Sequence, residues 1–253
     1  NFHAKLLKDL KQWMKKTVLC VDMGGVLIHY DPSPLKACIR DDRQEQLFKI
    51  ITEHDAGAIE FDDMFQCLND SCFKEYVFYA DFLKACEKCI VGVNAPMFHS
   101  LLRLKESGRA RLVLISDTDF FYFAQTALKF PEILELFREG DRGQWALSYR
   151  LRALKKDKSP FIRASSDFGF SRSDACFVDD REDNLKAAEK SGFKKDSLFL
   201  YKMEDPKNHF RFEKFLDKHF PASSFVPPHG LGIYRLRPHK GYLDYCTISN
   251  LGL

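Results

Sequence analysis

The 253-residue sequence contains no long hydrophobic run and no strong excess of charge of one sign. No stretch approaches 18 consecutive apolar residues, so we predict no membrane span, and no apolar core of a signal peptide is seen. Lysine and arginine number 39 against 36 acidic residues, a formal net charge of +3. This charge is too small to favour nucleic-acid binding or attachment to an anionic membrane surface.

The composition excludes a disordered or fibrous chain. Apolar residues make up 45% of the sequence, and the 24 phenylalanines dominate its aromatic content. A globular chain of this length can bury one sizeable core or two small ones. A chain this large needs no disulfide staples, so its eight scattered cysteines indicate a reducing compartment, and we expect the cytoplasm.

Four cysteines have a spacing loosely like that of a zinc site, but their context favours a structural role. They lie in helix-like segments that lack the glycines of a zinc knuckle. The four are Cys67, Cys72, Cys86 and Cys89.

Alternating hydrophobic patterns predict an α/β fold. Four short apolar runs, at 17–21, 111–115, 175–178 and 197–201, have the composition of strands buried on both faces of a parallel sheet. Helical patterns lie between them at 96–106, 120–128, 160–167 and 185–189. We therefore predict a doubly wound, Rossmann-like parallel sheet.

The remaining segments divide the chain further. Residues 33–95 follow helical spacing and predict a helical cap inserted after the first strand, so that the core comprises residues 18–32 and 96–203. Residues 1–17 predict a basic amphipathic helix. Residues 204–253 form a C-terminal extension of unknown role, either packed on the core or available to bind a protein partner.

Polar residues follow three of the predicted strands: Asp22, Ser116 and the adjacent pair Asp179 and Asp180. The carboxyl ends of parallel strands share one edge of a sheet, so these residues should converge. Clustered carboxylates are unfavourable unless a cation lies between them, and an all-oxygen site suits Mg²⁺. The alternative is that these acids only cap strands or turns.

These residues lie in three motifs that resemble the haloacid dehalogenase (HAD) superfamily of aspartate-nucleophile phosphohydrolases. The motifs are residues 18–27 (VLCVDMGGVL), 114–119 (LISDTD) and 177–184 (FVDDREDN). The resemblance covers about residues 18–203. Within the superfamily, the sequence is similar to the branch with a small helical cap, which includes bacterial enzymes acting on α-D-glucose 1-phosphate.

A basic residue is expected between the second and last motifs, and two lysines compete for the position. Residues 147–155 align with the family's leucine-serine-to-lysine segment, and the distance to Asp179 also fits, which favours Lys155. The family usually has proline after this lysine, whereas Lys156 stands here. Lys158, which precedes Ser159 and Pro160, is therefore the rival.

The resemblance implies a Mg²⁺-dependent phosphatase acting on a small phosphomonoester such as a sugar phosphate. Asp22 would attack phosphorus and form an aspartyl-phosphate that water then hydrolyses. Ser116, Asp117 and Lys155 would bind the phosphoryl oxygens.

The resemblance also implies the metal ligands: the carboxylates of Asp22 and Asp179 and the backbone carbonyl of Gly24. Asp180 would orient a metal-bound water or Lys155. Most phosphatases of the superfamily carry a general-acid aspartate where this chain has Gly24. Since acid catalysis contributes roughly 10²–10⁴-fold, we expect a preference for good leaving groups such as those of sugar 1-phosphates.

Two alternatives remain open: a non-catalytic scaffold built on the same fold, and a metal-independent dehalogenase. Cap residues would select the substrate, and Tyr30, His54 and Phe61 cannot be ranked. We expect His54 at a surface or helix end. The aromatic stretch at 120–123 is expected in the core or at a homodimer face rather than in a ligand pocket.

Overall fold

The computed structural model describes residues 17–221. The basic helix predicted within residues 1–17 lies outside this part except for its last residue. Most of the predicted extension, from residue 222 onward, also lies outside it. Within residues 17–221, no helix is long and apolar enough to cross a membrane.

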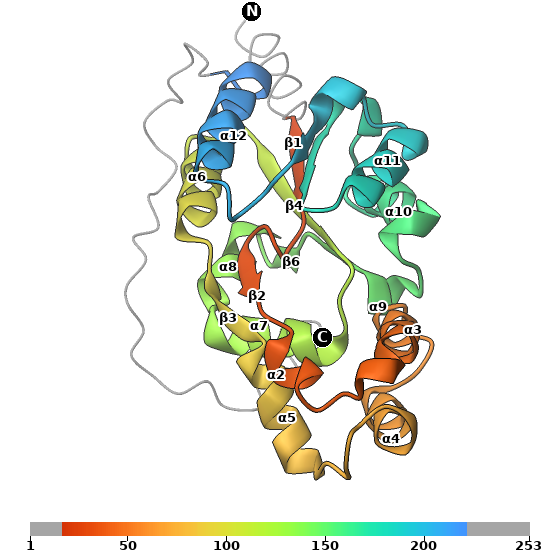
Figure 1. The fold of residues 1–253 in the computed structure, drawn as a ribbon. Helices are drawn as coiled ribbons and strands as arrows, with labels where there is room; N and C mark the ends of the chain where they lie inside the picture. Colours follow the sequence, from red (N-terminus) through yellow and green to blue (C-terminus); the bar gives the residue numbers. More distant parts are fainter. Residues whose placement is uncertain (1–16, 222–253) are drawn as a thin grey trace, which may run out of the picture. The chain divides into compact units, whose positions relative to one another are not determined.

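A five-stranded parallel sheet forms the centre of the core (Figure 1). Its order is β7-β4-β1-β8-β9, so the chain starts in the middle strand and winds outward to both edges. This doubly wound arrangement confirms the predicted fold class. The strands are β1 (Val18–Val21), β4 (Arg111–Ser116), β7 (Trp145–Leu147), β8 (Cys176–Asp179) and β9 (Leu198–Leu200).

Helices cover both faces of the sheet, which is why β1 and β8 are buried along their full length. Figure 1 shows α6 and α12 on one face and α10 and α11 on the other. Phe161 of α10 contacts Phe177 of β8 edge-on, with ring centroids 5.1 Å apart. The core helices are α6 (Ala95–Glu106), α7 (Phe120–Lys129), α8 (Pro131–Leu136), α9 (Ser148–Leu151), α10 (Ser159–Asp167), α11 (Glu182–Ser191) and α12 (Pro206–His219).

Several elements were not predicted from the sequence. Strand β7, helix α8 and a small β5–β6 pair (Arg138–Glu139 and Arg142–Gly143) lie in a stretch that shows no clear hydrophobic pattern. Helix α12 lies inside the predicted extension 204–253. Its Phe212 and Phe215 pack on Phe199 of β9, with ring centroids 5.3 and 5.2 Å apart. The described part of that extension is therefore packed on the core.

The helical cap is confirmed. It comprises α2 (Ser33–Lys36), the short 3-10 helix η1 (Asp41–Arg43), α3 (Gln44–Asp55), α4 (Phe61–Ser71) and α5 (Tyr79–Lys88). Its two ends run through β2 (Ile28–Tyr30) and β3 (Ile90–Val93), which pair antiparallel. The cap has a separate apolar core that includes Ile39, Leu68 and Phe82.

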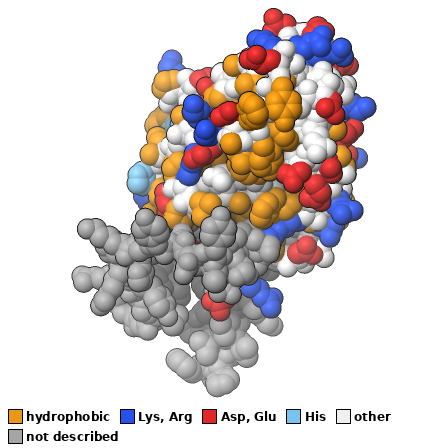
Figure 2. Space-filling model, turned by 90° about the horizontal axis from the view of Figure 1, so that it is seen from below, with side chains coloured by type: hydrophobic (Ala, Val, Ile, Leu, Met, Phe, Trp, Pro, Cys, Tyr) orange, Lys and Arg blue, Asp and Glu red, His pale blue; other side chains and the backbone are white. Residues whose placement is uncertain are grey.

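Aromatic side chains are exposed on the cap where α4 connects to α5. Tyr76 and Phe78 are 70% and 68% exposed, and their rings contact edge-on. Figure 2, viewed from the side on which α4 and α5 lie in Figure 1, shows hydrophobic side chains gathered on this face.

Candidate active site

The sequence motifs meet at the carboxyl ends of β1, β4 and β8. Val21 pairs with Leu114 of β4 and with Val178 of β8, so the residues that follow these positions are neighbours. The Asp22 backbone N–H donates to the Val178 carbonyl at 3.0 Å, which extends the ladder by one residue. Asp22, Ser116 and Asp179 therefore lie together at one edge of the sheet, as predicted.

Three carboxylates form a cluster at this edge. Asp22, Asp179 and Asp180 each offer one oxygen, and the three oxygens lie within 4.8 Å of one another. Burial raises the pKa of Asp22; the attraction of Lys155 opposes this shift, and repulsion from Asp179 and Asp180 adds to it. Burial and the nearby Asp179 likewise raise the pKa of Asp180. Such a cluster of oxygen ligands, with Asp22 and Asp179 buried and Asp180 partly exposed, fits a hard divalent cation such as Mg²⁺.

Lys155 is the positive charge inside the cluster. Its Nζ lies 2.9 Å from Asp22 Oδ1 and 2.6 Å from Asp179 Oδ2, and the residue is only 1% exposed. Burial alone would lower the pKa of Lys155, but the attraction of Asp179, Asp22 and Asp117 outweighs it, so the pKa is raised and the amine stays charged.

Lys158 lies outside the cluster. It is exposed and adopts a left-handed backbone conformation (φ 64°) between the 3-10 helix η2 (Lys155–Asp157) and α10. Of the two candidate lysines, the structure places Lys155 at the carboxylates. One lysine cannot neutralise three carboxylates, and the remaining negative charge favours binding of a divalent cation.

Two contacts that were not assigned from the sequence orient Asp179. Asn184, in the first turns of α11, donates its side-chain amide to both Asp179 oxygens at 3.0 and 3.1 Å. The backbone N–H of Arg181 donates to Asp179 Oδ1 at 2.9 Å. An asparagine five residues after a strand-end aspartate, at a helix start, is the signal that could have identified this contact.

The residues expected to bind phosphate lie beside the carboxylates. Ser116 is buried at the end of β4, and its hydroxyl makes only a long contact of 3.5 Å with the Asp117 carbonyl. The Asp117 carboxylate accepts the backbone N–H of Lys155 at 2.9 Å. This bond ties the loop after β4 to the segment that carries Lys155.

Gly25 is required next to Asp180. Its φ of +72° lies in the left-handed region, and an added Cβ would collide with the Asp180 carboxylate. Gly24 is different, because a Cβ there would meet only the Tyr122 hydroxyl, at 3.9 Å. A Cβ atom at position 24 is therefore sterically tolerated.

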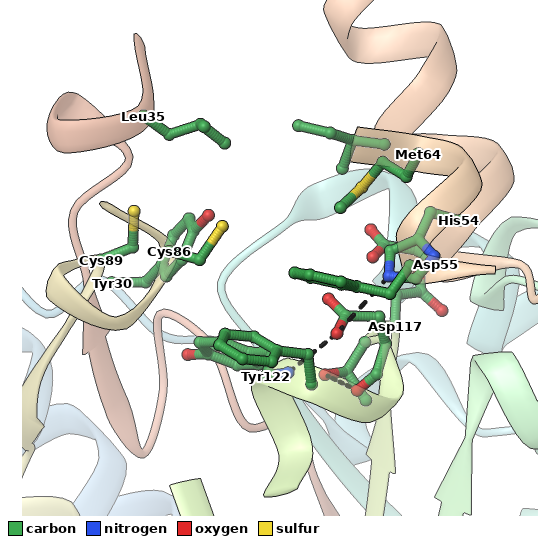
Figure 3. Close-up of a pocket in the computed structure, with 15 residues that line it drawn as sticks. Tyr30, Leu35, His54, Asp55, Met64, Cys86, Cys89, Asp117 and Tyr122 are labelled. Atoms are coloured by element: carbon green, nitrogen blue, oxygen red, sulfur yellow. Dashed lines mark hydrogen bonds and ion pairs between the residues drawn. The ribbon is translucent and has the colours of Figure 1, made fainter. Parts of the chain in front are cut away.

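A cavity of about 210 Å³ lies between the core and the cap and reaches Gly24 and Asp117 (Figure 3). Tyr30, His54 and Phe61, which the sequence did not rank, all line it. The remaining lining residues are Leu35, Ile51, Asp55, Met64, Cys86, Cys89, Thr118, Asp119, Phe121 and Tyr122.

The predicted placement of residues 120–123 was wrong for two of them. Phe121 and Tyr122 line the cavity, whereas Phe123 is buried and Phe120 is half exposed. The helical pattern identified α7 as apolar, but it could not show whether each apolar side chain meets the core or a cavity.

His54 lies at the end of α3, as expected, but it is buried rather than on the surface. Its Nδ1 lies 3.0 Å from the Ile59 carbonyl, and its Nε2 lies 3.6 Å from Asp119 Oδ1. Burial would lower the pKa of His54, but Asp119 outweighs this effect and the pKa is raised. Burial, followed by repulsion from Asp119, raises the pKa of Asp55 to about 8.

The chain combines a doubly wound sheet, a helical cap and clustered carboxylates at the strand ends. Solved structures of other proteins share this fold. A HAD family enzyme from Bacteroides thetaiotaomicron, crystallised with magnesium and inorganic phosphate, aligns with a TM-score of 0.64 at 22% identity, over 77% of this chain and 98% of that one. A predicted HAD-like hydrolase from Porphyromonas gingivalis aligns with a TM-score of 0.61 at 20% identity, over 78% and 97%.

An L-2-haloacid dehalogenase from Xanthobacter autotrophicus, with chloropropionic acid covalently bound, aligns with a TM-score of 0.50 at 12% identity, over 83% and 91% of the two chains. The sequence matches no family model and no curated protein. The chain therefore has the fold of HAD family enzymes, a fold that phosphatases and dehalogenases share.

Proposed function

We propose that this protein is a Mg²⁺-dependent phosphohydrolase that cleaves a small phosphomonoester through an aspartyl-phosphate on Asp22. The observation that carries the proposal is the buried Lys155 amine, which contacts Asp22 and Asp179 while Asp180 completes a three-carboxylate cluster. A dehalogenase needs the nucleophile but no metal, so three clustered carboxylates favour the phosphatase.

In the proposed reaction, an Asp22 oxygen attacks phosphorus, and the bond from phosphorus to the ester oxygen breaks. Water then attacks the aspartyl-phosphate, which releases phosphate and restores the carboxylate. Lys155, Ser116 and the Asp117 backbone N–H hold the phosphoryl oxygens as charge develops on them.

Asp22, Asp179 and the Gly24 carbonyl would hold Mg²⁺, and the Asp180 carboxylate reaches the same cluster. The bound metal supplies positive charge between the nucleophile and the phosphate. Asn184 and the Arg181 N–H keep Asp179 turned toward this position.

A phosphate-release screen tests the proposal. We expect release from a subset of sugar, nucleotide, phosphoamino-acid and aryl esters only when Mg²⁺ is present, with loss in EDTA and recovery on adding Mg²⁺ back. Hydrolysis of a haloacid without metal would favour the dehalogenase. Absence of turnover on every ester, with no shift of thermal unfolding by Mg²⁺, would favour the scaffold.

A second prediction concerns the missing general acid. Gly24→Asp places a carboxyl group where the space is open, next to Tyr122. We expect kcat/KM for alkyl phosphates to rise at least about tenfold, a fraction of the roughly 10²–10⁴-fold that a well-placed general acid contributes, while esters with good leaving groups change little. Gly24→Asn has the same shape without the proton and should give no gain. An equal gain in both variants would show that proton donation is not the reason.

A further inference from the structure

The cavity between core and cap is the site where the organic part of the substrate would bind, if the proposed function holds. Gly24 lies two residues after Asp22, and Asp117 follows Ser116, and both residues line this cavity. A phosphoryl group held at Ser116 and Lys155 would therefore direct its ester oxygen toward the cavity. The side chains of the cavity should then reveal the chemistry of the leaving group.

The walls of the cavity are mainly aromatic and aliphatic. Phe61 of the cap stacks on Phe121 of α7, with centroids 4.7 Å apart and planes at 25°. Tyr122 meets Tyr30 edge-on, with centroids 5.4 Å apart. Figure 3 shows Leu35 and Met64 on the cap side of the same space. The sides of these paired rings that face the cavity can take a further ring stacked or edge-on against them, and the thioether of Met64 adds a favourable contact.

The charges around the cavity argue against a strongly polar occupant. None of the described residues that line it is lysine or arginine, so a second phosphate or a carboxylate would find no cation. The hydroxyls of a sugar would be buried against mostly apolar walls, which is unfavourable without hydrogen bonds. The two carboxylates on the core side of the cavity already have partners, since Asp119 lies 3.6 Å from His54 Nε2 and Asp117 accepts the Lys155 backbone N–H.

Polar groups also border the cavity, among them the Tyr122 hydroxyl, which is buried without a hydrogen-bond partner, and the Asp55 carboxyl. The Asp55 carboxyl lies next to His54, and with its pKa near 8 it is mostly protonated at neutral pH. A protonated carboxyl group donates one hydrogen bond and accepts another. It therefore suits a single neutral polar substituent on an otherwise apolar group.

The size of the cavity fits a single ring. An apolar cavity of about 150 Å³ is known to hold benzene, so a cavity of about 210 Å³ accommodates one substituted ring. The acidity of the leaving group also favours an aryl ester. A phenol has a pKa of about 10, against about 15.7 for water, so a phenolate leaves without the general acid that Gly24 does not supply.

We propose that the substrate is an aryl phosphomonoester whose single aromatic ring packs against Tyr122 and against the cavity side of the stacked pair Phe61 and Phe121. A second cavity, of about 540 Å³, is the competing location for the organic group. It lies beside Gly25 and Asp180 and is lined by polar side chains, among them His29 and Lys202.

The first test compares phosphate release from phenyl phosphate, from an alkyl phosphate whose fluorinated alcohol is as acidic as phenol, and from glucose 1-phosphate, all with Mg²⁺. Because phenol and the fluorinated alcohol are equally acidic, a difference between their esters reports recognition of the aromatic ring and not the ease with which the leaving group departs. We expect kcat/KM for phenyl phosphate to exceed the other two values at least about tenfold. Acetyl phosphate serves as a small probe of the phosphoryl site itself.

The second test changes the wall of the cavity. Phe61→Ala should lower kcat/KM for phenyl phosphate at least about tenfold more than kcat/KM for acetyl phosphate, and Phe61→Leu should have a smaller effect. Phe48→Ala is the matched control, because Phe48 lies on the neighbouring α3, is 66% exposed and does not line the cavity. It should leave both values unchanged. Calorimetric binding of phenylphosphonate and methylphosphonate gives the same comparison without turnover, and we expect the phenyl compound to bind more tightly.

The outcomes separate the two proposals. Absence of hydrolysis for acetyl phosphate and every ester would overturn the proposed function. Hydrolysis of glucose 1-phosphate equal to or faster than that of phenyl phosphate would overturn the aromatic assignment and leave the phosphatase intact. Equal losses on both probes in Phe61→Ala would also overturn the assignment.

Discussion

Asp22→Asn should abolish phosphate release, lowering kcat by about 10³-fold or more, as expected when a covalent nucleophile is removed. The amide has the shape of the carboxylate but cannot form the acyl-phosphate. The fold should survive, because burial and neighbouring acids already raise the pKa of Asp22, and a neutral group there relieves that repulsion. The Lys155 contact with Asp179 remains.

Phosphate release at saturating Mg²⁺ and thermal unfolding, measured on the same preparations, check this prediction. Asp183→Asn is the matched control, since its exposed side chain lies on α11 close to the site without entering it. It should behave like the unmodified protein. If Asp22→Asn retained more than a tenth of the activity, the covalent mechanism would be wrong.

Lys155→Met should have the largest effect on stability. The methionine keeps most of the buried stem but leaves Asp22 and Asp179 without their cation. Removing one partner of a buried charge pair lowers the free energy of unfolding by about 3–5 kcal/mol. Mg²⁺ should restore part of this loss, because a divalent cation at the same carboxylates replaces the missing charge.

Urea unfolding with and without Mg²⁺ measures this effect. Lys158→Met, three residues away and exposed, should change the free energy of unfolding by no more than about 0.5 kcal/mol. The pair of variants also tests which lysine belongs to the third motif. Equal effects of the two substitutions on stability and on phosphate release would contradict the placement of Lys155.

The central strands and their acids were predictable for a physical reason. A strand buried on both faces must be apolar along its length, so β1, β4 and β8 stand out as continuous runs. Parallel strands end at a common edge, so the convergence of Asp22, Ser116 and Asp179 followed from their positions alone. Strand β7 was missed because its three apolar residues stand between Gln144 and Ser148, whereas the equally short β9 continues into the apolar Tyr201 and so shows a longer run.

The cavity was not predictable in the same way. Phe121 and Tyr122 belong to an apolar helix whose outer side chains meet a cap 60 residues earlier in the chain. Only the folded arrangement shows that these rings border open space. Likewise, the packing of α12 depends on Phe199, and the amphipathic pattern of residues 206–219 does not identify that partner.

The antiparallel pairing of β2 with β3 has a consequence for how such proteins diversify. Ile28 pairs with Val93, so the chain leaves the core and returns to it at adjacent positions. An insertion whose ends lie together can be lengthened, shortened or exchanged with little strain on the surrounding sheet. Residues 33–88 supply one wall of the cavity, and Phe121 and Tyr122 of α7 supply the other. Substitutions in the cap can therefore reshape half of the cavity without touching the carboxylate cluster at the ends of β1 and β8.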